Sequence, residues 1–474
     1  ATYIDVPQST AVRVELSTVE AAPPTAGASA PATRSESLHF TARGLFRGQP
    51  LTAEGRGDGA LAWRDATRPY ALQLDAMIGG TRVRADGHVT SLLELRAVDL
   101  QLALAGDSLS SLFPLIGIAL PPTPTYRSAG RLVREGALWR YEKFDGRIGQ
   151  SDITGTLQVD TGGVRPLLSG ALDSRRLDLA DLGPAVGART AVTRAASGVP
   201  VQASAKPGAA APGTRVLPDL PLDTSRWASL DADVTLRAQA LLRAKTLPLD
   251  TLQVRVRLKD SRLTLDPLSF GVAGGKLQAQ VTLDGRAQPL RGQAKAQLRG
   301  LQLGQLLPQA DLRKTSFGRL DGEFDLAGQG ASVGRMLAGA DGRLSLVAQD
   351  GEISRLLMEQ IGLHLLEILQ LQLAGDQSVK LHCAVADFDI VHGRMQARAL
   401  VLDTAVNTLV GDGHIDLAQE SLDLRVVPRT KVSSLVALRS PFYVRGSLGA
   451  PRVEIDRGRI AARGVGALAL GLLN

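Results

Sequence analysis

The feature that most constrains the fold is a period-two alternation of apolar and polar residues between Val379 and Pro451. The alternating runs are Ala397 to Asp403, His414 to Leu417, Leu422 to Val426 and Phe442 to Val444. The turns are expected at His392-Gly393, at Gly411-Asp412-Gly413, at Gln419-Glu420-Ser421 and from Leu448 to Pro451. Such spacing of strands and turns is typical of an antiparallel meander. Because successive side chains of a strand point to opposite faces, the sheet should be apolar on one face and polar on the other.

Composition favours one long repetitive body over several thick domains. The 474 residues are 44% apolar but only 4% aromatic, and 50 of them are glycine. A chain this poor in large aromatic side chains lacks the residues that dominate close-packed cores. We therefore predict a mostly β fold: a long, repetitive, antiparallel, curved sheet that forms a β-groove, with a few amphipathic helices.

A repeat supports this prediction. Three segments each begin at a turn glycine, continue through alternating strands, and close on a leucine-rich stretch and a proline. They run from Gly79 to Pro114, from Gly149 to Pro184 and from Gly274 to Pro308, which gives lengths of 35, 35 and 34 residues between the two ends. Similar spacing in three copies indicates one supersecondary unit that is used repeatedly.

The pattern divides the chain into five parts. Residues 1–184 form the first part of the groove, with a mobile loop at 17–36; residues 185–222 are a low-complexity, disordered insertion; residues 223–353 form the central groove; residues 354–373 form an amphipathic helix; and residues 374–474 form the C-terminal meander and the start of a terminal helix. The helix at 354–373 is expected to cover the apolar face or cap the sheet, or alternatively to lie on a membrane surface.

The residue types that carry catalysis or bind metal do not form convincing groups. The segment Gly330 to Gly334 fits G-x-S-x-G, but a serine before a short helix is more often its N-cap, so Ser332 is predicted to be a cap. The single cysteine, Cys383, and the six histidines lack zinc spacing, and the Asp-Gly pairs are interpreted as hairpin turns and not as calcium loops. We predict neither an enzyme, nor a metal site, nor a cofactor.

Charge argues against nucleic acid as a partner. The net charge of +7 comes from 54 Lys and Arg against 47 Asp and Glu, and the arginines are spaced along strands without stacking aromatics between them. A weakly basic outer face favours anionic lipid headgroups, or it only keeps the sheet soluble. Both interpretations stay open.

The C-terminal region resembles the AsmA-like family of bacterial envelope proteins. The resemblance is carried by CAVADF (Cys383 to Phe388), ALVLDT (Ala399 to Thr404), GDGHIDL (Gly411 to Leu417), ESLDLRVVP (Glu420 to Pro428) and SPFYVRGSLGAP (Ser440 to Pro451). It implies a periplasmic β-groove, anchored in the inner membrane, that serves phospholipid transport and outer-membrane integrity. The chain begins Ala-Thr-Tyr without a signal peptide or a long apolar run, so the anchor implied by the resemblance is expected outside this chain.

The remaining question is what covers the apolar face. A second sheet, the protein's own helices and a bound apolar ligand all satisfy the pattern. For the ligand, phospholipid acyl chains, the groove residues are predicted to be Val254, Val256, Leu277, Ala279, Val281, Leu283, Leu400, Leu402, Leu422 and Leu424. The alternative function is a non-enzymatic scaffold that assists outer-membrane protein assembly with an outer-membrane or periplasmic protein partner.

Overall fold

The computed structural model describes residues 2–5, 9–19, 37–59, 68–91, 95–116, 120, 122–182, 216–217, 219, 222, 224, 227–242, 249–306, 317–354, 378–405, 407–431 and 441–455. It is 73% strand and 6% helix, so the prediction of a mostly β, antiparallel, repetitive sheet is confirmed. The chain divides into two compact units. None of the helices in these ranges is long and apolar enough to cross a bilayer.

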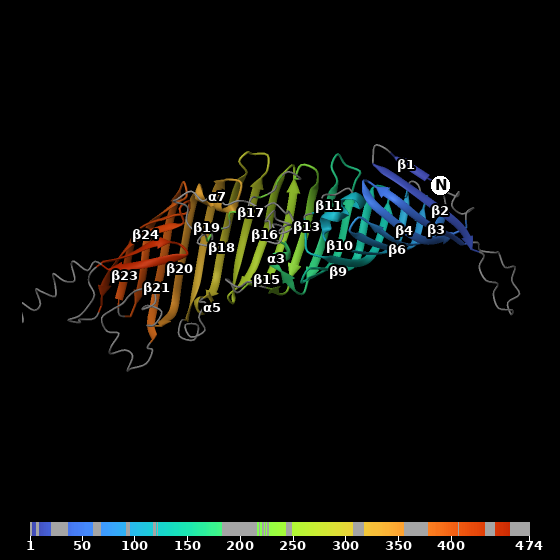
Figure 1. The fold of residues 1–474 in the computed structure, drawn as a ribbon. Helices are drawn as coiled ribbons and strands as arrows, with labels where there is room; N and C mark the ends of the chain where they lie inside the picture. Colours follow the sequence, from blue (N-terminus) through green and yellow to red (C-terminus); the bar gives the residue numbers. More distant parts are fainter. Residues whose placement is uncertain are drawn as a thin grey trace, which may run out of the picture. The chain divides into compact units, whose positions relative to one another are not determined.

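Unit 1 comprises Ala1–Thr190, Asp223–Arg243 and Gln253–Ser261. Its strands are β1 (Thr2–Asp5), β2 (Thr10–Val19), β3 (Ser37–Phe46), β4 (Gln49–Asp58), β5 (Pro69–Ile78), β6 (Thr81–Thr90), β7 (Ala97–Gly106), β8 (Tyr126–Glu135), β9 (Leu138–Ile148), β10 (Ser151–Asp160), β11 (Leu167–Ser174), β12 (Leu177–Asp178), β13 (Asp231–Ala238), β14 (Leu241–Leu242) and most of β15 (Leu249–Lys259). From β1 to β11 each strand pairs antiparallel with the next one in the chain (Figure 1).

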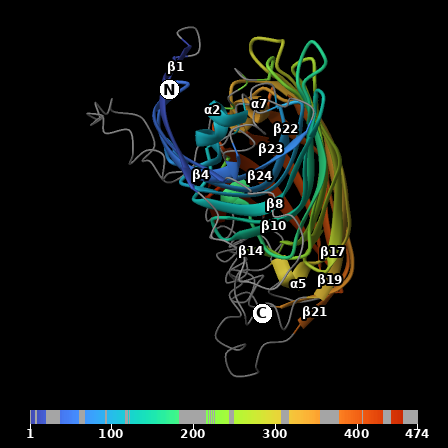
Figure 2. The ribbon, with the colours of Figure 1, turned by 90° about the vertical axis from the view of Figure 1, so that its right-hand side faces the viewer.

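Unit 2 comprises Ala191–Leu222, Ala244–Leu252 and Arg262–Asn474. Its strands are β16 (Arg262–Val272), β17 (Gly275–Asp284), β18 (Arg291–Gln302), β19 (Phe317–Gln329), β20 (Asp341–Ser354), β21 (Ser378–Val391), β22 (Arg394–Thr404), β23 (Asn407–Asp416), β24 (Ser421–Thr430), β25 (Phe442–Ser447) and β26 (Ala450–Ile455). They too pair antiparallel in chain order. Strands such as β17 and β19 bend along their length (Figure 2).

Short helices close each copy of the predicted repeat. They are η1 (Leu109–Leu112) with α2 (Phe113–Ile116), α3 (Leu179–Leu182) and α5 (Leu303–Leu306); a further helix, α7 (Val333–Ala338), follows β19. Each copy begins at a hairpin turn whose glycine has a positive φ and continues through two long strands to one of these helices. The structure therefore confirms the repeat that was predicted from spacing.

Hydrophobic clusters form along one face of each unit. In unit 1, buried Val89, Val98 and Leu100 pack with half-buried residues such as Leu72 and Trp139, and all of these come from the consecutive strands β5 to β9. The clusters of unit 2 are built in the same way from neighbouring strands. The residues of each cluster come from adjacent, hydrogen-bonded strands and lie on the same face. The core is therefore a single layer of side chains that extends along one face of the sheet.

Two predictions of loops and turns are wrong. Strand β2 reaches Val19, so Ser17 to Val19 pair with β3 and do not begin the expected loop at 17–36; the rest of that loop lies outside the described residues. The Gly411-Asp412-Gly413 turn lies inside β23. Its local composition is that of a turn, but pairing with both neighbouring strands outweighs the local preference.

Most of the Asp-Gly pairs also lie inside strands. Of the eight pairs, only Asp58-Gly59 and Asp284-Gly285 lie at the end of a strand, that of β4 and that of β17, whereas Asp86-Gly87 and Asp341-Gly342 are in β6 and β20. Gly87 and Gly342 both have a φ of +149°, a conformation that other residues rarely adopt. These glycines let the partner strand come close and are not turn residues.

The low-complexity insertion follows α3 and precedes a parallel pairing. Strand β13 runs parallel to β11, with Leu167 opposite Asp231, so the chain must return to the edge of unit 1 where β11 began. A parallel pair needs a long crossover connection, which this segment provides. Most of residues 185–222, the predicted helix at 354–373 apart from Ser354, and the predicted terminal helix at 460–473 lie outside the described residues.

The end of this insertion is attached to unit 2. The backbone N–H of Val216 donates to Glu420, and the backbone N–H of Leu222 donates to the carbonyl oxygen of Ala331 at 2.8 Å. The expectation of a disordered excursion therefore fails for these positions.

Candidate functional site

Strand pairing brings the predicted groove residues of unit 2 onto one apolar face. Leu277, Ala279, Val281 and Leu283 alternate along β17 and are half-buried, whereas Gln278 between them is exposed. Each has an apolar residue or glycine opposite it on β16 and on β18.

One row crosses the centre of this face. We call it the central row; it consists of Leu268, Ala279, Ala296, Phe324, Leu344, Phe388 and Ala397, each paired with the next across β16 to β22. Ala296 and Phe388 are each 5% exposed, whereas the other members are half-buried. The row thus keeps apolar surface that its neighbours only partly cover.

The other predicted groove residues of unit 2 continue this face. Leu400 packs in the cluster that contains Phe388, and Leu402 packs against the cluster of Leu409 and Phe442. Leu422 and Leu424 lie on β24 opposite Ile415 and Gly413, and both are half-buried. All eight predicted positions of unit 2 therefore share one face; their contact with lipid stays a prediction.

The two predicted residues on β15 belong to unit 1 by their contacts. Val254 is 7% exposed, whereas Val256 is half-buried. A side chain as buried as Val254 offers little surface to a ligand, so of the two Val256 is the better candidate.

The two units fill their apolar faces differently. In unit 1 aromatic rings lie over strand glycines: a Cβ on Gly55 would meet the Phe40 ring at 2.4 Å, and one on Gly57 would meet Tyr70 at 2.3 Å. In unit 2 the facing positions of β17 and β18 are small, with Ala279 opposite Ala296. Small side chains at facing positions make the surface of these two strands flatter than that of unit 1. The sequence suggested only that such a surface leaves room for acyl chains.

The opposite, polar face carries cross-strand ion pairs. Arg343 donates two hydrogen bonds to Asp387 at 3.0 and 2.8 Å, and Ser345 donates a third at 2.6 Å. These donors lower the pKa of Asp387 to about 2. In unit 1, Arg82 and Arg84 likewise lower the pKa of Asp75 to about 2. These carboxylates stay ionised at neutral pH and keep this face suited to water.

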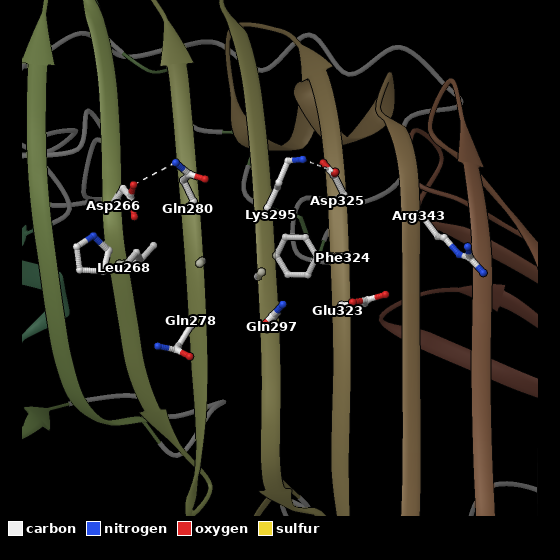
Figure 3. A pocket seen from close by; sticks show the side chains of 13 residues that line it. Asp266, Leu268, Gln278, Gln280, Lys295, Gln297, Glu323, Phe324, Asp325 and Arg343 are labelled. Carbon is white, nitrogen blue, oxygen red and sulfur yellow. Dashed lines mark hydrogen bonds and ion pairs between the residues drawn. The ribbon is translucent and has the colours of Figure 1, made fainter.

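A hollow of about 550 Å³ crosses strands β16 to β20, and polar side chains line it together with Leu268, Ala279, Ala296 and Phe324 of the central row (Figure 3). Its side chains bond to one another: Gln280 donates to Asp266 at 3.1 Å, and Lys295 lies 2.8 Å from Asp325. A lining of paired charges favours water over hydrocarbon. The polar part of the lining therefore suits water better than an acyl chain, whereas the central-row residues supply an apolar part.

Loss of Asp387 should weaken the fold in a pH-dependent way. A carboxyl whose pKa is depressed on folding stabilises the protein above its unfolded pKa of about 3.9, and the gain disappears as the pH falls through about 2. We expect Asp387→Asn to lower the free energy of unfolding by about 1 kcal/mol at pH 7 and to match wild type near pH 2. Urea unfolding across pH checks this; Asp389→Asn, whose contact with Arg398 is 3.4 Å, is the control with a smaller effect. A pH-independent difference would contradict the assignment.

Ser332, the candidate nucleophile, is an N-cap as predicted. Its Oγ accepts from the Arg335 backbone N–H at 3.1 Å and donates to Asp219 at 2.6 Å, and the residue is 2% exposed. Across the described ranges no three potential ligands from His, Cys, Asp and Glu come together as a metal site.

Loss of the cap at Ser332 should affect stability. Ser332→Ala removes one acceptor of the helix N-terminus, so we expect a loss of about 1 kcal/mol in the free energy of unfolding. Ser332→Asn, which can still cap, should lose less than half of that in the same denaturant titration. An equal loss in both variants would assign the effect to the bond with Asp219 or to the packing of this buried side chain, and not to the cap.

The fold and these two faces define a repetitive β-sheet protein with one apolar and one polar face. The chain belongs to the AsmA family, an envelope-associated family whose model matches residues 36–400. It is similar to the AsmA family protein YhjG of Escherichia coli (strain K12), with 37% identity over 437 residues that cover 91% of this chain and 64% of the relative. The chain thus spans less than two thirds of the length of that relative. No solved structure matches it.

Proposed function

We propose that the apolar face of unit 2 binds phospholipid acyl chains, and that the protein thereby holds or conducts phospholipid between the inner and outer membranes. The observation that carries this proposal is the central row, in which five of the seven apolar side chains are only half-buried and Ala279 lies opposite Ala296. A face of this kind is stabilised when a guest removes its remaining apolar area from water.

The transfer free energy of acyl chains from water is large enough to support lipid binding at this face. Burial of each CH₂ group is favourable by about 0.8 kcal/mol, so the transfer of two acyl chains with about thirty methylenes from water to an apolar surface is favourable by roughly 24 kcal/mol. A groove that provides such a surface needs no catalytic group. The polar face, with its ion pairs, keeps the same sheet compatible with an aqueous compartment.

The periplasmic location and the inner-membrane anchor belong to this proposal, together with support of outer-membrane integrity. They rest on membership of the AsmA family and on the resemblance of the C-terminal region.

Mass spectrometry of the purified protein tests the proposal. We expect an organic extract of the natively purified chain to contain phospholipid in at least equimolar amount, and a competing excess of fatty acid to displace it. Purified protein without lipid, together with a stable protein partner in pull-downs, would reject lipid binding and favour the scaffold function.

A further inference from the structure

A row of arginines crosses one edge of unit 1 on its polar face. Strand pairing aligns Arg13, Arg43, Thr52, Met77, Arg82, Ala105, Arg127 and Arg147 from β2 to β9. We call the five arginines of this line the arginine row; all are exposed. Arg13 lies directly opposite Arg43, and Arg127 directly opposite Arg147. Like charges in such positions repel each other and destabilise a sheet.

Few carboxylates neutralise this row. Arg82 forms an ion pair with Asp75, but within the described residues no ion pair is recorded for Arg13, Arg43 or Arg127. Arg147 faces Asp152, whose carboxylate accepts from Arg175, from Ser174 and from a backbone N–H instead. The next row inward contains four carboxylates, those of Glu15, Glu54, Asp75 and Asp145, and a single arginine, Arg84. Positive charge is therefore concentrated at the edge itself.

Exposed apolar side chains gather at the same edge. Phe113 and Ile116 of α2 are 53% and 45% exposed, and Leu45 and Met77, at the ends of β3 and β5, are 46% and 43% exposed. Arg47, in the β3–β4 turn, donates to the carbonyl oxygen of Pro114 at 3.1 Å, which ties α2 to this edge.

The opposite edge of unit 1 provides the contrast. It also exposes apolar residues, among them Val164 and Leu167. Two of its arginines, however, form ion pairs: Arg140 bonds to Glu135 at 3.0 Å, and Arg165 forms ion pairs with aspartates on β13 and after β15. The two edges differ in free positive charge, not in apolar exposure.

We propose that this edge of unit 1 docks on the surface of an anionic phospholipid bilayer. The arginine row meets the headgroup phosphates, and Phe113 and Ile116 enter the boundary between headgroups and acyl chains. Arginines near an anionic surface and apolar side chains beside them act together in interfacial binding. This inference deepens the proposed function, because it brings the sheet to the membrane from which phospholipid is drawn.

Vesicle flotation tests the docking with the full chain. We expect the chain to float with vesicles of phosphatidylcholine and phosphatidylglycerol at 7:3, and to stay at the bottom with pure phosphatidylcholine. Arg43→Gln with Arg127→Gln should weaken binding about 30-fold, since each arginine near the surface contributes about 1 kcal/mol. Phe113→Ser with Ile116→Ser should weaken binding at least tenfold.

The control removes the same charge elsewhere. Arg131→Gln with Arg255→Gln takes two arginines from the ion pairs with Asp99 and Asp233 and should change vesicle binding less than threefold. Equal loss in both double variants would mean that only net charge matters and would overturn the docking edge. Full binding by Arg43→Gln with Arg127→Gln would also overturn it. The lipid content of the natively purified variants distinguishes this failure from failure of the proposed function, because the variants should still carry phospholipid.

Discussion

Gly342→Ala is expected to lower the free energy of unfolding by about 3 kcal/mol or more. Gly342 has a φ of +149°, and a Cβ built there would lie 2.0 Å from the backbone carbonyl oxygen of Asp325 on the neighbouring strand. Both the strained backbone and the displaced strand β19 oppose the alanine. Chemical denaturation followed by circular dichroism measures the loss.

A glycine three residues away supplies the control. Gly339 caps α7 with a φ of −119°, and a Cβ there would meet nothing within 4 Å. Gly339→Ala should therefore stay within about 1 kcal/mol of wild type, or gain stability by restricting the unfolded chain. If both variants unfold alike, the close approach of β19 and β20 at Gly342 is not a constraint on the fold.

Val281→Arg is expected to reduce the phospholipid that co-purifies with the protein by tenfold or more. Val281 is half-buried on the apolar face, between Leu265 and Ala294 on the neighbouring strands. Placing an arginine in hydrocarbon costs about 2.5–3.5 kcal/mol, which corresponds to a factor of about 100 in acyl-chain occupancy if the guanidinium stays there. Because the long arginine side chain can extend its guanidinium into water, the cost is reduced, and we expect a tenfold loss of bound phospholipid.

Gln278→Arg is the matched control for this experiment. It adds the same charge to the same strand, but on the exposed polar face. Its lipid content should equal that of wild type, and circular dichroism should show both variants folded. Cells that depend on the protein should become permeable to hydrophobic antibiotics with Val281→Arg and not with Gln278→Arg. Equal lipid in the two variants would reject the apolar face as the binding site.

The sequence by itself determined the strands and their two faces. Alternation along β17 placed Leu277 and Val281 on one side and Gln278 on the other, because a strand has a period of two whatever it pairs with. The three glycine-to-proline intervals also revealed the repeat, since equal units need equal lengths of chain. The short helix after Ser332 followed from its capping residue.

Only the tertiary structure decided which residues meet across strands. The arginine row joins residues as distant in sequence as Arg13 and Arg147, and its like-charged neighbours arise from strand register, which no local pattern specifies. The same reason explains the error at Asp341-Gly342, where the dipeptide of a hairpin turn lies within a strand. The dipeptide Asp-Gly is compatible with a turn or with a strand. Hydrogen bonding of β20 to both β19 and β21 selects the strand conformation here.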